Sequence, residues 1–266
     1  GSDHDRASCQ PENAGMTALR TEIHRGFDGA PLAVHRMGTG RPVILLHGLF
    51  SSAQVNWIKY GHAARIADAG FEVLMPDLRA HGGSAAPHDP AAYPSDVLVQ
   101  DLAALVAGLG LADFDLGGFS LGARTAARAV IAGVAPRRLV LGGMGLAGLT
   151  RWGGRGDFFL DVIDRLGTIP RGDPAYFAQA FMQTMKVDPV AARLLLQSVE
   201  GAASADLARI AMPVLVVCGA DDQDNGSAPD LAAALPDGRY AEIPGTHMSC
   251  VTQRQLGEEI AAFLAG

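Results

Sequence analysis

One short stretch, Gly118-Phe119-Ser120-Leu121-Gly122, limits what this chain can fold into more than any other. It follows an apolar run that ends at Leu116 and precedes a helical pattern that continues to Ile131. Glycine has no Cβ, so the positions two before and two after Ser120 permit a very tight strand-to-helix turn. Such a turn lifts the serine hydroxyl clear of a sheet, beside the first unpaired N–H groups of the helix. The stretch therefore predicts a nucleophilic serine or, alternatively, a serine that only caps the helix.

The chain on either side of this stretch alternates between strand-like apolar runs and helical patterns. The run Val43-Ile44-Leu45-Leu46 is apolar at every position, which is typical of a strand buried on both faces. Parallel strands need a helical crossover between them, so the alternation predicts an α/β fold. We expect a mostly parallel, twisted sheet of about eight strands with helices on both faces. The predicted strands are 17–24, 30–37, 43–46, 71–75, 113–116, 138–141, 213–218 and 238–243, and the predicted helices are 56–69, 95–109, 121–131, 228–235 and 251–264.

Between residues 142 and 206 the pattern changes to helices alone, which we expect at 157–166, 173–186 and 188–200. Asp173-Pro174 and Asp188-Pro189 each place a capping residue before a proline at the first helical position. The sequence therefore predicts a small helical insertion, residues 146–206, in a core formed by residues 16–145 and 207–266. Residues 1–15 are polar and begin with Gly-Ser, and we expect a disordered lead-in or a tag remnant there.

Composition narrows the partners and the compartment. The 266 residues carry a net charge of −7 without a lysine or arginine cluster, which argues against nucleic acid or an anionic membrane as a partner. Cys9, Cys218 and Cys250 are an odd number without CxxC spacing, which favours a reducing compartment over a disulfide or zinc framework. No apolar run approaches the roughly 20 residues of a membrane span. We expect a cytoplasmic protein with a small-molecule substrate, unless a signal peptide once preceded it.

A nucleophilic serine needs a base, an acid that orients the base, and two N–H donors for an oxyanion. His247 follows the last predicted strand, at the edge where open α/β sheets build their sites. The other seven histidines lie in the lead-in, the first hairpin, a helix, a polar loop or glycine turns, so His247 is the predicted base. Three carboxylates, Asp221, Asp222 and Asp224, follow the preceding strand, and their spacing alone does not decide which is the acid.

The order serine, aspartate, histidine resembles the α/β-hydrolase superfamily. The similarity covers the chain from Thr17 to its end. Two residues depart from the family pattern, since Ala80 and Thr246 stand where glycine is frequent, but neither is a reacting group. The matching motifs are His47-Gly48, Asp77-x-Arg79-x-x-Gly82-x-Ser84, the serine pentapeptide, Gly219-x-x-Asp222 and His247.

The resemblance implies roles for particular residues. It selects Asp222, three residues after Gly219, as the acid of a Ser120–Asp222–His247 triad. It also implies an oxyanion hole formed by the backbone N–H groups of Leu49 and Leu121, with Phe50 as the fallback for the first. No cofactor and no metal are expected.

The helical insertion corresponds to the cap domain of that family. Its apolar faces carry Phe158, Phe159, Phe177, Phe181, Met182 and Met185, most of which we expect to form the core of the cap. We expect Phe50, Phe119 and Phe181 to contact substrate. Arg151 and Arg155 near the cap entrance are candidates for binding a substrate carboxylate, although we favour a solvated surface position for both.

The resemblance also narrows the reaction. Haloalkane dehalogenases and epoxide hydrolases of the superfamily carry aspartate at the position of Ser120, because their alkyl-enzyme ester requires a carboxylate. Serine instead implies a hydrolase of a small, largely apolar carboxylic ester, thioester or lactone, acting through an acyl-enzyme. The alternatives are a C–C bond hydrolase of a ring-cleavage diketone, a perhydrolase or haloperoxidase, and a ligand sensor without catalysis.

Overall fold

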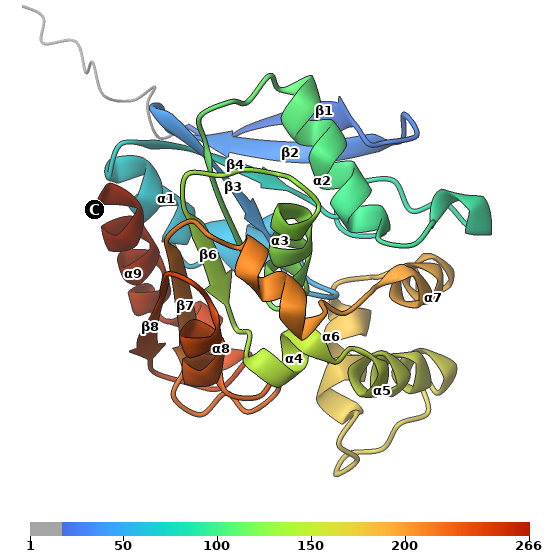
Figure 1. The fold of residues 1–266 in the computed structure, drawn as a ribbon. Helices are drawn as coiled ribbons and strands as arrows, with labels where there is room; N and C mark the ends of the chain where they lie inside the picture. Colours follow the sequence, from blue (N-terminus) through green and yellow to red (C-terminus); the bar gives the residue numbers. More distant parts are fainter. Residues whose placement is uncertain (1–17) are drawn as a thin grey trace, which may run out of the picture.

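Eight strands form one sheet in the residues that the computed structural model describes, 18–266 (Figure 1). The order is β1-β2-β4-β3-β5-β6-β7-β8. β2 is antiparallel to both of its neighbours, and all other pairs are parallel, which confirms the predicted mostly parallel sheet. The predicted lead-in at 1–15 lies outside the described residues. The strands are β1 Arg20–Arg25, β2 Pro31–Met37, β3 Arg41–Leu46, β4 Phe71–Pro76, β5 Asp115–Phe119, β6 Leu139–Gly142, β7 Val214–Gly219 and β8 Gly238–Ile243.

Helices cover both faces of the sheet, as the apolar run at 43–46 predicts. On β3, Ile44 and Leu46 pack into a cluster shared with α2 (Val97–Gly108), α3 (Leu121–Ile131) and α8 (Ala228–Ala234). Val43 and Leu45 point to the opposite face and pack with α1 (His62–Asp68) and α9 (Arg254–Ala265). Figure 1 shows α1 and α9 on one side of the sheet and α2, α3 and α8 on the other. Burial of alternate side chains in two separate clusters explains why β3 contains no polar position after its first residue.

The prediction of a single helix at 56–69 is wrong, because this segment forms two separate helical elements. A π-helical turn at Gln54–Ile58 is separated from α1 by Gly61, whose φ of +83° is left-handed. The turn is tied to the end of β3, because the Asn56 side chain accepts the Gly48 N–H at 2.9 Å. The Asp77 carboxylate after β4 also accepts the Ala53 N–H at 2.9 Å. These tertiary hydrogen bonds override the local helical periodicity.

Four helices lie between β6 and β7, where the insertion was predicted. They are α4 Leu146–Thr150, α5 Gly153–Asp164, α6 Tyr176–Thr184 and α7 Pro189–Ser198. Asp188 caps α7 as predicted, since its Oδ1 accepts the N–H groups of Val190 and Ala191 at 2.9 and 3.1 Å. α6 begins two residues after Pro174, and α4 was not predicted. In Figure 1, α5, α6 and α7 project beyond one end of the sheet.

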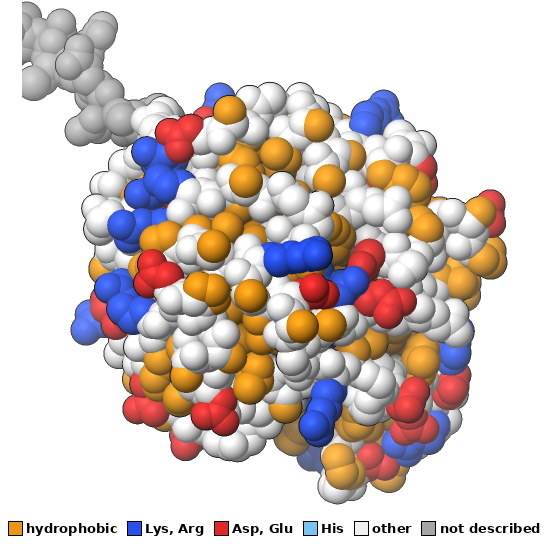
Figure 2. Space-filling view, in the orientation of Figure 1, with side chains coloured by type: hydrophobic (Ala, Val, Ile, Leu, Met, Phe, Trp, Pro, Cys, Tyr) orange, Lys and Arg blue, Asp and Glu red, His pale blue; other side chains and the backbone are white. Residues whose placement is uncertain are grey.

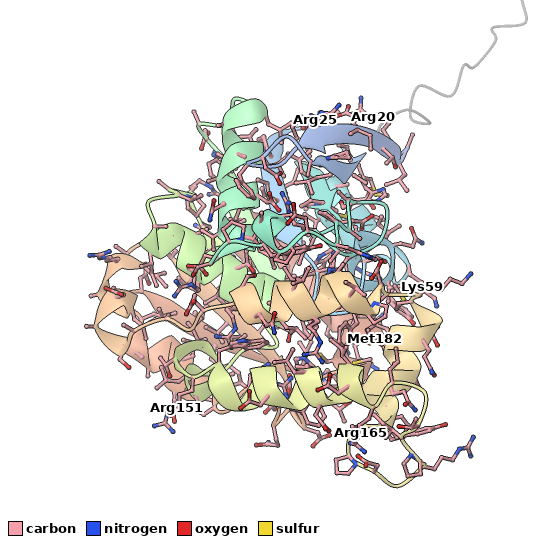
Figure 3. All side chains as sticks on the ribbon, turned by 90° about the vertical axis from the view of Figure 1, so that its right-hand side faces the viewer. Arg20, Arg25, Lys59, Arg151, Arg165 and Met182 are labelled. Atoms are coloured by element: carbon pink, nitrogen blue, oxygen red, sulfur yellow. The ribbon has the colours of Figure 1, made fainter. Side chains whose placement is uncertain are left out.

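The insertion has an apolar cluster of its own. Met182 of α6 is 1% exposed, and in Figure 3 its side chain lies between α5 and α7. It packs with Ile163 and Leu196, and the cluster includes Phe50 from the loop after β3. α5 begins four residues earlier than predicted. The sequence did not indicate this first turn because its glycines disfavour helix. At Gly156 a Cβ would lie 2.9 Å from the Trp152 indole nitrogen, so only glycine fits there without displacing that ring.

The surface carries charges of both signs. Figure 2 shows acidic and basic side chains interspersed over the face drawn, with apolar side chains between them. Among the helices of residues 18–266, none is long and apolar enough to cross a membrane.

Candidate active site

Ser120 lies on a strained turn between β5 and α3. Its φ of 54° and ψ of −113° are rare for a residue with a side chain, and its N–H donates to the Gly142 carbonyl at 2.8 Å. A Cβ on Gly118 would lie 2.2 Å from the carbonyl carbon of Gly122, and a Cβ on Gly122 would lie 2.1 Å from the Leu46 oxygen. The steric reason predicted for both glycines is thus confirmed. The Ser120 side chain makes no capping hydrogen bond to α3, which removes the helix-cap alternative.

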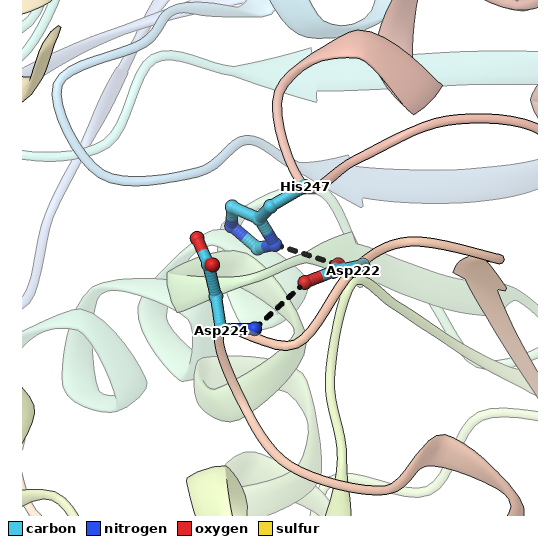
Figure 4. A group of neighbouring side chains, drawn as sticks. All are labelled: Asp222, Asp224 and His247. Carbon is cyan, nitrogen blue, oxygen red and sulfur yellow. Dashed lines mark hydrogen bonds and ion pairs between the residues drawn. The ribbon is translucent and has the colours of Figure 1, made fainter.

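The structure brings Ser120, His247 and Asp222 into one hydrogen-bonded chain. His247 lies in the loop after β8, and its Nε2 is 3.1 Å from Ser120 Oγ. Its Nδ1 is 2.8 Å from Asp222 Oδ2, as Figure 4 shows. An ionised carboxylate can only accept, so Nδ1 carries the proton and Nε2 is free to accept the serine O–H. The histidine is therefore oriented to take a proton from Ser120.

Asp222 is the only one of the three neighbouring carboxylates whose side chain reaches His247 and is buried. It is 6% exposed, whereas Asp221 and Asp224 are exposed. Burial tends to raise the pKa of the Asp222 carboxyl, but the hydrogen bond from His247 and its charge hold that pKa below its usual value. The Asp224 N–H and the Cys218 thiol also donate to this carboxylate. The geometry of the loop therefore identifies Asp222 as the hydrogen-bond partner of His247, which the spacing of the three carboxylates alone did not decide.

Two backbone N–H groups beside Ser120 have no acceptor within residues 18–266. One belongs to Leu121, which begins α3 and so has no intrahelical acceptor, and the other belongs to Leu49. Both residues line the same cavity as Ser120. The Phe50 N–H, the alternative to Leu49 as an oxyanion donor, donates to His81 Nε2 at 2.9 Å. It is therefore not free to bind an oxyanion, and that alternative prediction is wrong.

Two buried histidines hold the loop that carries Leu49. His47 Nε2 accepts the Leu78 N–H at 2.9 Å, and its Nδ1 donates to the Gly48 carbonyl at 2.7 Å. His81 accepts from Phe50 and donates from Nδ1 to the Arg79 carbonyl at 3.0 Å. Both rings must be neutral to accept these bonds. Each of these histidines precedes a glycine in a turn-forming sequence, which indicates no role for it, and only the tertiary contacts show the positioning role.

We expect stability to fall as the pH is lowered from about 6.5 towards 3. Burial, with the nearby His81 adding to it, lowers the pKa of His47 from 6.5 to about 3. The unfolded chain therefore binds more protons than the folded chain throughout that window, so acid favours unfolding. The difference in the pKa of His47 between the folded and unfolded chains is expected to lower the free energy of unfolding by roughly 2 kcal/mol at about pH 5. Urea unfolding at about pH 7.5 and pH 5 measures the difference.

The matched variant is His47→Gln, because glutamine can still accept one backbone N–H and donate to one carbonyl but does not titrate. It should lose less stability than the wild type between the two pH values. An equal loss in both proteins would contradict the assignment to His47.

The cavity above Ser120 has a volume of about 620 Å³ and a mainly apolar lining that is rich in aromatic side chains. Phe50, Phe119 and Phe181, the three predicted substrate contacts, all line it. Phe119 also supports the base, since its ring centre lies 5.1 Å from that of His247. The cap contributes further aromatic side chains, namely Phe158, Phe159 and Phe177. The cavity is therefore lined both by loops at the edge of the sheet and by α5 and α6 of the helical insertion.

The two arginines named from the sequence lie in different environments. Arg151 is exposed, and Figure 3 shows its side chain extending away from the protein. Arg155 lines the cavity and is half-buried, with its guanidinium 5.0 Å from the centre of the Phe159 ring. The surface position favoured for Arg155 is therefore wrong. Arg124, for which no sequence motif predicts a role, is buried and lines the same cavity.

Asp222, Asp224 and His247 also form a group whose potential metal-ligand atoms lie within 4.8 Å of one another (Figure 4). The Nδ1 proton of His247 already occupies the space between His247 and Asp222. A cation bound by all three side chains through Nδ1 would displace that proton and break the hydrogen bond that orients the base. The donor set thus fits its hydrogen-bonding role better than a metal site.

Comparisons with known proteins agree with this fold. The profile described as "Alpha/beta hydrolase family" matches residues 43–262. An epoxide hydrolase from Caballeronia sordidicola is 33% identical over 104 residues, which are 39% of this chain and 31% of that protein. The chain thus spans less than a third of the length of the curated relatives that it matches.

Two solved structures show how far the similarity extends in space. An esterase from Exiguobacterium antarcticum has a TM-score of 0.76 at 17% identity, and the match covers 93% of this chain and 100% of that one. An enol-lactonase from Burkholderia xenovorans has a TM-score of 0.72 at 20% identity, with 92% and 100% covered. At these identities the similarity shows the fold.

Proposed function

Because this chain belongs to the alpha/beta hydrolase family, we propose that it is a serine hydrolase of a small, largely apolar carboxylic ester, thioester or lactone. One observation carries the proposal. The hydrogen-bonded chain from Ser120 through His247 to Asp222 opens into a largely apolar cavity, beside two N–H groups that have no acceptor within residues 18–266. A nucleophile, a base, an orienting acid and oxyanion donors are the complete set that acyl transfer requires.

In the proposed reaction, Ser120 Oγ attacks the substrate carbonyl as His247 Nε2 takes its proton. The Leu49 and Leu121 N–H groups stabilise the oxyanion, and the buried Asp222 carboxylate stabilises the imidazolium. His247 then protonates the leaving alcohol or thiol, which leaves an ester on Ser120. Water, deprotonated by His247, hydrolyses that ester and restores the enzyme.

Epoxide hydrolysis is disfavoured by the chemistry of the nucleophile. A serine hydroxyl that opened an epoxide would form an ether, and activated water does not cleave an ether readily. A carboxylate nucleophile would instead form an ester, which water can hydrolyse. Since Ser120 occupies the turn between β5 and α3, we assign acyl transfer rather than the activity named for the partly matching relatives.

A reactivity test separates the proposal from a non-catalytic ligand sensor. We expect a fluorophosphonate probe to label the protein on Ser120, since only an activated serine reacts with it. A series of p-nitrophenyl esters of increasing acyl length should then be hydrolysed, because the aromatic lining favours apolar acyl groups. The absence of both labelling and turnover would overturn the proposal. Faster cleavage of a vinylogous 1,5-diketone than of every ester would favour a C–C bond hydrolase instead.

A further inference from the structure

The cavity contains a buried cation, the Arg124 guanidinium, that no carboxylate within residues 18–266 neutralises. Arg124 of α3 lies four residues after Ser120, on the same face of the helix, and is 1% exposed. Its guanidinium donates to the carbonyl oxygens of Gly148 and Leu149 and stacks on the Trp152 ring, 4.6 Å from the ring centre. Its Nε has no partner within residues 18–266. No carboxylate of that range forms an ion pair with it, and none is among the groups that shift its pKa.

A second cation, Arg155 of α5, lines the same cavity. Within the described part of the chain it has neither a hydrogen-bond acceptor nor an ion-pair partner, and it contacts the face of the Phe159 ring. The charge of Arg155 acts on Arg124: burial, then the charge of Arg155 and then that of Arg128 lower the pKa of Arg124 to about 10. Both remain protonated at neutral pH, so the cavity contains two positive charges.

The acids facing these arginines do not cancel both charges. Asp224 lines the cavity but is exposed, and Asp222 is already hydrogen-bonded to His247. Burial lowers the pKa of Arg155, while the charges of Asp224 and then Asp222 act in the opposite direction. Neither acid lies within ion-pair distance of Arg155.

Another buried arginine of the same chain shows the usual arrangement. Arg79 is 0% exposed, and its guanidinium is paired with Asp28 at 2.7 Å and with Asp101 at 2.8 Å. A buried cation without such a partner is costly unless an anion is present. The planar guanidinium fork matches a carboxylate, so the missing partner has the chemistry of a substrate carboxylate.

We propose that the substrate of Ser120 bears a carboxylate in addition to its scissile carbonyl, and that Arg155 binds this carboxylate with the charge of Arg124 adding to the attraction. The inference rests on the proposed hydrolase function and narrows its substrate class to apolar esters or lactones with one anionic end. The aromatic lining accommodates the apolar part, and the arginines accommodate the charge. Arg155 is a specificity residue here, because it contacts a part of the substrate that does not react.

The test compares p-nitrophenyl hydrogen adipate with its neutral methyl ester, each corrected for spontaneous hydrolysis. The wild type should have the higher kcat/KM for the anionic ester, mainly through a lower KM. Arg155→Gln should lower kcat/KM for the anionic ester by about 10- to 100-fold, the usual effect of one charge-assisted hydrogen bond. The neutral ester should change by less than about twofold. Arg151→Gln, an exposed arginine near the start of the same cap, is the matched control and should change neither rate.

The outcomes separate this inference from the proposed function. If both esters are hydrolysed but Arg155→Gln affects them equally, the inference fails and the serine hydrolase stands. If neither ester is hydrolysed and Ser120 resists the fluorophosphonate probe, the proposed function fails.

Competition of hexanoate and of hexanamide with a bound fluorescent fatty acid analogue then tests the anion site without turnover. Stronger competition by hexanoate, lost in Arg155→Gln, supports the site, whereas equal competition overturns it.

Discussion

Replacing Ser120 with alanine is expected to lower kcat for ester hydrolysis by about 10⁴-fold or more while leaving the fold intact. Among residues 18–266, the variant removes the only hydroxyl within hydrogen-bond distance of His247 Nε2, so no acyl-enzyme can form there. Alanine keeps the Cβ that the turn already accommodates, and the Ser120 side chain makes no capping bond whose loss would destabilise α3. The rate with a p-nitrophenyl ester and the midpoint of thermal unfolding are the two measurements.

Ser95→Ala is the matched control, because Ser95 is exposed and donates only to the side chain of Glu200. Its rate should equal that of the wild type. If Ser120→Ala retained ester turnover within about tenfold of the wild type, the hydroxyl would not be the nucleophile.

Replacing Gly122 with alanine is expected to destabilise the protein by about 3 kcal/mol or more, the upper part of the range for overpacked sites. The added Cβ would lie 2.1 Å from the Leu46 oxygen, 2.6 Å from the Leu46 carbonyl carbon and 2.7 Å from the His47 oxygen. All three are main-chain atoms at the end of β3, so no side-chain rotation can relieve the contact. The helix that carries the Leu121 N–H would have to move away from the sheet.

The control for that prediction is Gly108→Ala at the end of α2, where a Cβ would have no heavy atom within 4 Å. Alanine there should leave the free energy of unfolding unchanged or raise it by up to about 1 kcal/mol. Urea unfolding of the two variants and the wild type at one pH measures both effects. Equal free energies of unfolding for the two variants would show that the packing of the turn is not tight.

Local sequence patterns were sufficient to predict those features that depend only on neighbouring residues along the chain. The apolar run at 43–46 indicated burial on both faces, and the two glycines around Ser120 indicated a tight turn. The position of His247 after the last strand indicated the edge of the sheet at which Ser120 also lies. In each case the signal lies in the residues themselves or in their neighbours along the chain.

The features that were missed depend on contacts between distant residues. Gly61 interrupts the helix predicted at 56–69 because hydrogen bonds from other loops fix the turn before it. His81 is set in place by the Phe50 N–H, 31 residues away along the chain. Arg155 lies in the first turn of α5 and lines the cavity. This position was not predicted because the segment is rich in glycine, so its local helix propensity is low. Burial of a charge, in particular, cannot be inferred from the identity of its neighbours in sequence.

The most direct test of the central claim is the identification of a covalent intermediate by mass spectrometry. A slowly hydrolysed p-nitrophenyl ester is mixed with the protein in ¹⁸O-labelled water, the reaction is quenched in acid, and the peptides are analysed. The account predicts a mass increase equal to the acyl group on the peptide that contains Ser120, with ¹⁸O in the released acid and none in the protein. Turnover with no acylated Ser120 and with ¹⁸O incorporated into Asp222 or Asp224 would contradict it.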